Sequence, residues 1–136
     1  MELELKRGGR TARVETLGGE LVSYRDERGL EYIWGGDPAY WTGRNPLLFP
    51  IVGMLKEGKI RFDGREYAME RHGFARRREF TPAARGEDWV RLELRESAET
   101  LALYPYPFRL AVEQRLTDTG FSTAVTVANP GEGPLP

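Results

Sequence analysis

The chain has 136 residues, with 20 basic and 21 acidic side chains, one histidine and no cysteine. This length is typical of a single domain with one hydrophobic core, and a formal net charge of -1 argues against nucleic acid or an anionic membrane as a partner. The absence of cysteine excludes disulfides and thiolate ligands, and a lone histidine argues against a zinc site, so we expect no metal.

The N-terminal stretch "MELELKRGG" alternates leucine with charge and lacks the apolar segment of a secretory signal. Hydrophobic residues in the rest of the chain mostly recur with a period of two, and glycine and proline separate short runs. The longest apolar run, "PLLFPIVGML", has ten residues, which is too few to span a bilayer. We therefore predict an all-β chain that folds as an antiparallel β-sandwich, is soluble and lies in the cytoplasm.

The first predicted strands, "TARVETL" and "ELVSYR", lie on either side of Gly18-Gly19, because adjacent glycines tolerate the positive φ of tight hairpin turns. The next predicted strand, "LEYIW", is closed by Gly35-Gly36, and its Trp34 is expected in the core. The clearest hairpin is "KIRFDGREYAM", in which Asp63-Gly64 turns the chain and hydrophobic residues alternate on both sides.

The second half of the chain predicts two half-buried strands, "WVRLELR" and "FRLAVEQRL", and between them one helical turn with Ser97 as its N-cap. A last strand, "FSTAVTVAN", ends at Asn129-Pro130. The closing residues "GEGPLP" are typical of a turn, yet no returning strand follows, which leaves the last strand with an unpaired edge. A disordered terminus and a protein cut near its middle both explain this ending.

Two motifs resemble functional sites and are rejected. The segment "GMLKEGKI" is similar to a phosphate-binding P-loop, but Ile60 stands where serine or threonine must offer a hydroxyl to magnesium. Arg71 and the run Arg76 to Arg78, with two phenylalanines, resemble a nucleic-acid patch, but a strand would send neighbouring arginines to opposite faces. We therefore expect no nucleic acid as a partner.

His72, in "ERHGFARRREF", has two interpretations. A single histidine beside glycine is more often a turn residue or a hydrogen-bond partner than a catalyst. However, the nearby guanidinium groups disfavour the imidazolium, and a neutral ring donates at one nitrogen and accepts at the other, which suits a sugar hydroxyl. Gly73 permits a tight turn, so Arg76 can reach the same ligand as His72.

A second stretch, "YWTGRNPLLFP", places Arg44 and Asn45 among aromatic residues that include Trp41. Sugar sites combine planar hydrogen-bonding groups with aromatic faces, so the two stretches fit together. The residues that we predict to bind substrate are Arg44, Asn45, His72 and Arg76.

The sequence resembles the galactose mutarotase (aldose 1-epimerase) family in the segments "DPAYW", "NPLLFPIVG", "GKIRFDGREY" and "HGFAR", and the likeness continues to "VTVANPGEGPLP". The resemblance implies that residues 1–136 are the N-terminal portion of a single galactose mutarotase-like β-sandwich domain, a supersandwich that is incomplete at the C-terminus. It also implies interconversion of the α and β anomers of an aldose without a cofactor. Some relatives with "HGFAR"-type motifs act on hexose 6-phosphates, and paired arginines suit a phosphate.

Anomer exchange needs a proton delivered to the ring oxygen and another removed from the C1 hydroxyl. The resemblance implies that a second histidine and a glutamate, both beyond residue 136, act as acid and base, while His72 is the catalytic-site residue that hydrogen-bonds the sugar. Met54 stands where many relatives place a substrate-binding arginine, and a thioether does not replace a guanidinium.

We predict an aldose 1-epimerase-like protein that acts on an aldose or aldose phosphate and is inactive as this chain alone. The alternative is a noncatalytic monosaccharide or sugar-phosphate binding module, and a purely structural β-domain ranks third. The sequence leaves the identity of the aldose and the oligomeric state open.

Overall fold

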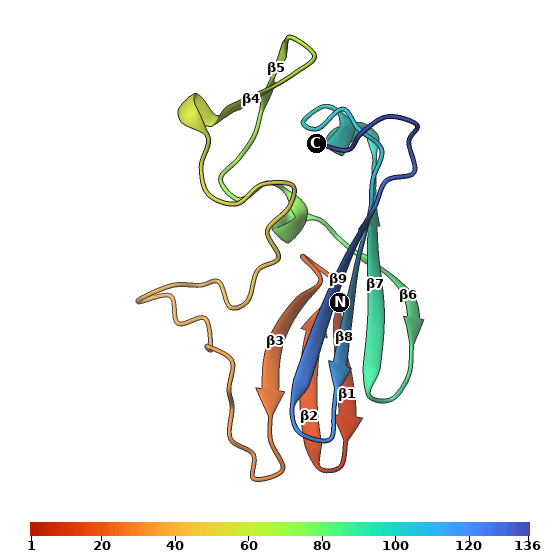
Figure 1. Cartoon of the computed structure of the whole chain (residues 1–136). Coiled ribbons are helices and arrows are strands. Elements are labelled where there is room, and N and C mark those ends of the chain that lie inside the picture. Colours follow the sequence, from red (N-terminus) through yellow and green to blue (C-terminus); the bar gives the residue numbers. More distant parts are fainter.

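The computed structural model describes all residues from 1 to 136, and most of its strands form two antiparallel sheets that pack face to face (Figure 1). The first sheet has the order β1-β2-β3, and the second has the order β6-β7-β8-β9. Contacts of β1 and β2 with β8 join the two sheets. The predicted all-β antiparallel sandwich is confirmed. The bounds of these strands are Glu2–Arg7, Arg10–Glu15, Glu20–Arg25, Thr81–Arg85, Trp89–Arg95, Arg109–Leu116 and Phe121–Ala128.

Alternating hydrophobic residues fill the space between the sheets. Successive side chains of a strand point to opposite faces, so a period of two places every second residue of β7 and β8 in the core. The predicted inward residues of these strands are all buried: Val90, Leu92, Leu94, Leu110, Val112 and Leu116. Leu3 and Leu5 of β1 face them from the other sheet and belong to the same core. The alternation of "MELEL" therefore forms a strand, which the sequence analysis did not predict.

The predicted hairpin "KIRFDGREYAM" is confirmed as β4, Lys59–Phe62, and β5, Arg65–Ala68, which form a separate two-stranded sheet at one end of the sandwich (Figure 1). Its turn residues Asp63 and Gly64 have φ values of 49° and 77°, as a tight hairpin requires. Phe62 packs edge-on against Tyr104, with ring centroids 5.5 Å apart, and thereby attaches the hairpin to the core.

The helical turn predicted at "SAETL" is confirmed as α1, Ala98–Leu101. The Ser97 hydroxyl accepts a hydrogen bond from the backbone N–H of Thr100, and the Thr100 hydroxyl accepts one from the backbone N–H of Ser97. Two short 3₁₀ turns complete the elements, η1 at Lys56–Gly58 and η2 at Ala75–Arg77. No helix is long and apolar enough to cross a membrane.

The strand predicted at "LEYIW" is wrong, because residues 26–55 run as a long irregular segment. Asp26 starts it by accepting hydrogen bonds from the backbone N–H groups of Arg28 and Leu30, which closes a turn directly after β3. Glu31 forms only an isolated bridge with Arg25. The expectation that Trp34 lies in the core is also wrong, since this residue is 43% exposed and donates its ring N–H to the carbonyl of Trp41.

The strand-like alternation expected for the arginine run is wrong as well. Arg71 lies in a turn, and Arg76 and Arg77 lie in η2, so these side chains do not alternate across a sheet. The strand β6, which follows, was not predicted, because "TPAAR" is exposed throughout and lacks an apolar period.

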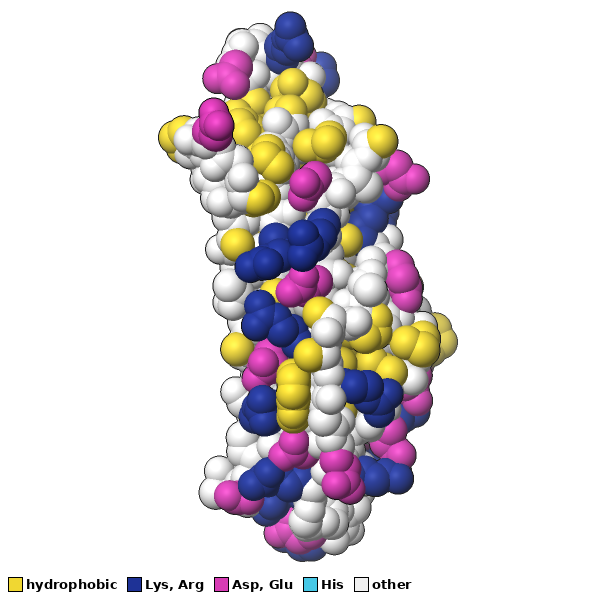
Figure 2. All heavy atoms as spheres, turned by 90° about the vertical axis from the view of Figure 1, so that its right-hand side faces the viewer, with side chains coloured by type: hydrophobic (Ala, Val, Ile, Leu, Met, Phe, Trp, Pro, Cys, Tyr) yellow, Lys and Arg dark blue, Asp and Glu magenta, His cyan; other side chains and the backbone are white.

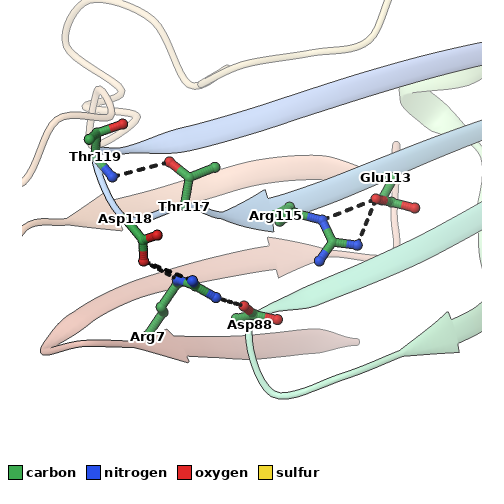
Figure 3. Close-up of polar contacts among 7 residues, drawn as sticks. All are labelled: Arg7, Asp88, Glu113, Arg115, Thr117, Asp118 and Thr119. Carbon is green, nitrogen blue, oxygen red and sulfur yellow. Dashed lines mark hydrogen bonds and ion pairs between the residues drawn. The ribbon is translucent and has the colours of Figure 1, made fainter.

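An ion-pair network connects the two sheets at the end of the sandwich where β1 ends and β7 begins (Figure 3). Arg7, the last residue of β1, donates from Nε and Nη2 to Asp118 at 3.0 and 2.7 Å and from Nη1 to Asp88. Asp88 precedes β7, and Asp118 lies in the turn between β8 and β9, so one guanidinium joins both sheets. The hydrogen bonds that Arg7 donates to Asp118, and to a smaller extent the one that it donates to Asp88, raise the pKa of Arg7.

Candidate functional site

His72 lies in the turn between β5 and η2, where two consecutive residues have left-handed backbone conformations. The φ values are 68° for His72 and 71° for Gly73. Glycine is required at the second position, because a Cβ there would lie 2.1 Å from the carbonyl oxygen of Phe49. The same oxygen accepts hydrogen bonds from the N–H groups of Phe74 and Ala75 at 2.9 and 3.2 Å. The tight turn predicted at Gly73 is therefore present, and it is fixed against a segment more than twenty residues earlier in the chain.

The His72 ring is held by the backbone of Gly53. Its Nδ1 atom accepts a hydrogen bond from the Gly53 N–H at 2.9 Å, while the His72 N–H donates to the Gly53 carbonyl at 2.8 Å. A neutral imidazole that accepts at Nδ1 carries its proton on Nε2. The half-buried ring therefore has one free donor, Nε2–H, for a ligand.

Two arginines and a tryptophan share an open hollow of about 470 Å³ with His72. The lining residues are Trp41, Pro46, Leu48, Arg71, His72 and Arg76. This volume is within the range of roughly 300 to 1,000 Å³ that is typical of small-molecule sites. An indole face, an imidazole donor and two guanidinium groups are suited to the apolar faces and the hydroxyl or anionic groups of a sugar.

Neither arginine of the hollow is neutralised by a carboxylate. Arg76 donates from Nη2 to the carbonyl of Arg71 at 2.9 Å, which fixes its guanidinium, and its buried Nε has no partner. Arg71 makes no ion pair, although Arg77 and Arg78 close by are paired with Glu70 and Glu99. Two positive charges therefore remain available beside His72.

The structure does not place Arg44 and Asn45 in the lining of this hollow. Their backbone N–H groups both donate to one carboxylate oxygen of Glu20, at 3.2 and 2.5 Å, at the start of β3. The Arg44 side chain lies against Gly36. Asn45 directly precedes Pro46, which does line the hollow, and Arg44 is one residue earlier.

Sequence reasoning did not assign Arg71, Pro46 and Leu48 to the site, and it left Trp41 open. Arg71 is adjacent to His72, but the strand expected there would have pointed the two side chains in opposite directions. The other three residues come from the irregular segment 26–55, whose path has no period from which to predict it. Met54 is 76% exposed and does not line the hollow.

A larger hollow of about 850 Å³ lies elsewhere, bordered by β6, β7 and α1. Its charged residues are Arg77, Arg78, Glu79, Glu93, Arg95 and Glu99, so basic and acidic groups balance. Arg95 pairs with Glu93, and Arg78 pairs with Glu99. Figure 2 shows one face of the molecule on which basic and acidic side chains are interspersed and no histidine is visible. Because its charges are paired within the protein, this hollow is a weaker candidate than the one at His72. No cluster of three or more His, Asp or Glu side chains is arranged to hold a metal ion.

A model of the family described as "Aldose 1-epimerase" matches residues 1–136. This chain belongs to the aldose 1-epimerase family. Two proteins of Lactococcus lactis subsp. lactis named LacX, one plasmid and one chromosomal, are 39% and 38% identical to it over 134 residues. The matches cover 95% of this chain and 45% of each relative.

Solved structures of the same kind agree in fold. A galactose mutarotase-like protein from Lactobacillus casei matches with a TM-score of 0.92 and 32% identity, over 95% of this chain and 44% of that chain. A galactose mutarotase related enzyme from Lactobacillus acidophilus also gives 0.92, at 27% identity, over 95% of this chain and 43% of that chain. This member of the epimerase family therefore spans less than half the length of these four relatives.

Proposed function

We propose that this chain forms the sugar-holding part of an aldose 1-epimerase site, in which the α and β anomers of an aldose or aldose phosphate interconvert. The observation that carries the proposal is the joint presence of His72, Trp41, Arg71 and Arg76 in one hollow of a family member. Cytoplasmic location is part of the same proposal.

In this site, Nε2–H of His72 donates to a sugar oxygen near the anomeric centre, and the ring of Trp41 packs against the sugar face. Arg71 and Arg76 bind either hydroxyl groups or a phosphate. No carboxylate lines the hollow, so the hollow supplies no acid and base pair for ring opening. We therefore assign the acid and the base to residues outside these 136, as the family resemblance implies. Arg44 and Asn45 are proposed to contact the sugar from the segment that leads into Pro46.

The same observation favours the second candidate function, a monosaccharide or sugar-phosphate binding module without catalysis. One imidazole positions a ligand and transfers at most one proton, whereas general acid and base catalysis each contribute about 10² to 10⁴ in rate. The two candidates predict the same binding and differ only in whether anomer exchange becomes faster.

Binding is tested by NMR titration with glucose, galactose and glucose 6-phosphate, because the single histidine gives one set of imidazole signals. We expect Nε2 of His72 to carry the proton in the free neutral ring, and its signals to shift with sugar. Arg71→Met should weaken binding of the phosphate roughly ten- to a hundredfold, since a hydrogen bond to a charged group contributes about 1.5 to 3 kcal/mol.

The matched control is Arg65→Met, which removes another exposed arginine without an ion pair, outside the hollow. Equal binding by wild type, His72→Ala and Arg71→Met would refute the proposed site. Polarimetry on freshly dissolved α-glucose separates the two functions when this chain is combined with the part of LacX that it does not match: faster anomer exchange supports the epimerase, and an unchanged rate supports the binding module. The chain alone should leave the rate unchanged, and acceleration that persists in His72→Ala would contradict the role of that residue.

A further inference from the structure

The turn between β2 and β3, residues 17–20, contacts both walls of the hollow at His72, although none of its residues lines that hollow. This β2–β3 turn is fixed to the core of the sandwich. Gly18 and Gly19 are both buried, and the carbonyl of Gly19 accepts a hydrogen bond of 3.1 Å from the side chain of Gln114, which is 2% exposed. The turn is therefore a rigid support for the segments that pack on it.

One wall of the hollow, which includes Trp41, comes from the irregular segment that runs back along β3 towards the start of that strand (Figure 1). Residues 42–48 form only two hydrogen bonds. The N–H groups of Arg44 and Asn45 donate them to the Glu20 carboxylate, at 3.2 and 2.5 Å. Glu20 forms no ion pair, so these two N–H groups are the only partners of its carboxylate.

The contact with Glu20 determines where the indole of Trp41 lies. Gly43 directly precedes the two bonded N–H groups, and a Cβ on Gly43 would lie 2.3 Å from Cζ2 and 2.5 Å from Cε2 of the Trp41 ring. The indole therefore lies directly against the backbone of Gly43. A shift of that backbone would move the ring that packs against the sugar in the proposed site.

The other wall contains Arg71, His72 and Arg76, and the β2–β3 turn supports it at Gly18. The N–H of Gly18 donates to the carbonyl of Arg78 at 2.8 Å, directly after η2. Gly18 has a φ of 74°, and a Cβ there would lie 3.0 Å from the carbonyl oxygen of Arg76 and 3.3 Å from its Cα. Glycine therefore allows the backbone of Arg76 to approach the turn closely.

We propose that Glu20 is a positioning residue of the sugar site, and that Gly18 supports the opposite wall from the same turn. The Glu20 carboxylate holds the backbone at Arg44 and Asn45 so that Trp41 faces a sugar bound at His72. This inference rests on the proposed function, because it concerns the same hollow. Glu20 does not touch the sugar and acts only through Trp41.

Loss of the Glu20 carboxylate should loosen the first wall without unfolding the protein. Leu47 packs against the hydrophobic core, so the segment stays attached when its two hydrogen bonds are removed. The apparent dissociation constant rises as the arrangement that binds the ligand becomes less populated. A wall that is in place about a tenth of the time therefore weakens binding about tenfold.

The test is an NMR titration with whichever of glucose, galactose and glucose 6-phosphate binds the wild type most tightly. Glu20→Ala should weaken binding about tenfold, and Glu20→Gln, which keeps an acceptor oxygen, should restore most of the affinity. In a Trp41→Ala background, Glu20→Ala should cause no further loss, because a residue that acts through Trp41 then has nothing to position. The matched control is Glu15→Ala, which should bind as the wild type does. Glu15 stands in register with Glu20, and its carboxylate makes no hydrogen bond.

A second pair of variants tests the opposite wall. Gly18→Ala places a Cβ 3.0 Å from the Arg76 carbonyl oxygen, so it should shift the guanidinium signal of Arg76 and weaken binding of the same sugar. Gly8→Ala is its control, since Gly8 has a φ of 53° and no atom within 4 Å of an added Cβ. Equal binding by the two variants would overturn the role of Gly18.

Three results would overturn the role of Glu20: equal binding by the wild type and Glu20→Ala, an equal loss in Glu20→Gln, or losses that add fully to that of Trp41→Ala. If the wild type binds none of the three sugars, the proposed function fails, and the free proteins decide the positioning role. The amides of Arg44 and Asn45 should then exchange faster, and the indole N–H signal of Trp41 should shift, in Glu20→Ala but not in Glu15→Ala. Unchanged exchange and an unchanged indole signal would overturn the positioning role as well.

Discussion

Gly73 offers a sharp test of how the candidate site is built. In Gly73→Ala, the new Cβ would meet the Phe49 carbonyl oxygen at 2.1 Å, where ordinary contacts are 3.4 Å or longer, so the two segments must separate. That oxygen accepts two backbone hydrogen bonds, each contributing about 1 kcal/mol. A positive φ costs alanine about 1 kcal/mol more than glycine. We therefore expect Gly73→Ala to lower the free energy of unfolding by about 3 kcal/mol.

Urea unfolding followed by tryptophan fluorescence measures this loss, with Gly64→Ala as the matched control. Gly64 has a similar φ of 77° but no atom within 4 Å of an added Cβ, so it should lose only about 1 kcal/mol. The imidazole signals of His72 should shift in Gly73→Ala and stay unchanged in Gly64→Ala. If Gly73→Ala and Gly64→Ala have the same free energy of unfolding, and the slope of that free energy against urea concentration is unchanged, the close approach of residues 49 and 73 is refuted.

Three further predictions concern stability. Hydrogen bonds from the Arg28 guanidinium are the main cause that lowers the pKa of Asp26 from 3.8 to about 2, so their contribution is complete above pH 4 and disappears as the pH falls towards 2. Between pH 4 and pH 2, the free energy of unfolding of Asp26→Asn should therefore fall less than that of the wild type, as measured by circular dichroism. An equal fall in both proteins would contradict this. Arg7→Met should lower the thermal midpoint more at low salt than at 1 M salt, since Asp88 and Asp118 lose their shared partner; a loss independent of salt would speak for packing instead. Ser97→Ala removes the cap of α1 and should cost about 1 kcal/mol in urea unfolding, whereas Ser97→Asp should restore most of it.

Local patterns decided most of the strands. The alternation of Val90, Leu92 and Leu94 and the turn at Asp63-Gly64 could be predicted because side-chain direction and turn conformation depend on neighbouring residues. The same reasoning failed at "LEYIW", where the Glu31 carboxylate bonds backbone N–H groups instead of letting the segment join a sheet.

Local sequence patterns were sufficient to predict the sandwich, its strands β7 and β8, the hairpin β4–β5 and the position of the single His72 before Gly73. The folded chain was needed to see that the irregular segment returns to place Trp41, Pro46 and Leu48 beside Arg71 and Arg76, and that the backbone of Gly53 orients the imidazole. The physical reason is the distance along the chain. A period of two acts between neighbouring residues, whereas these contacts join residues about 20 to 35 positions apart through backbone hydrogen bonds and packing that no local pattern encodes.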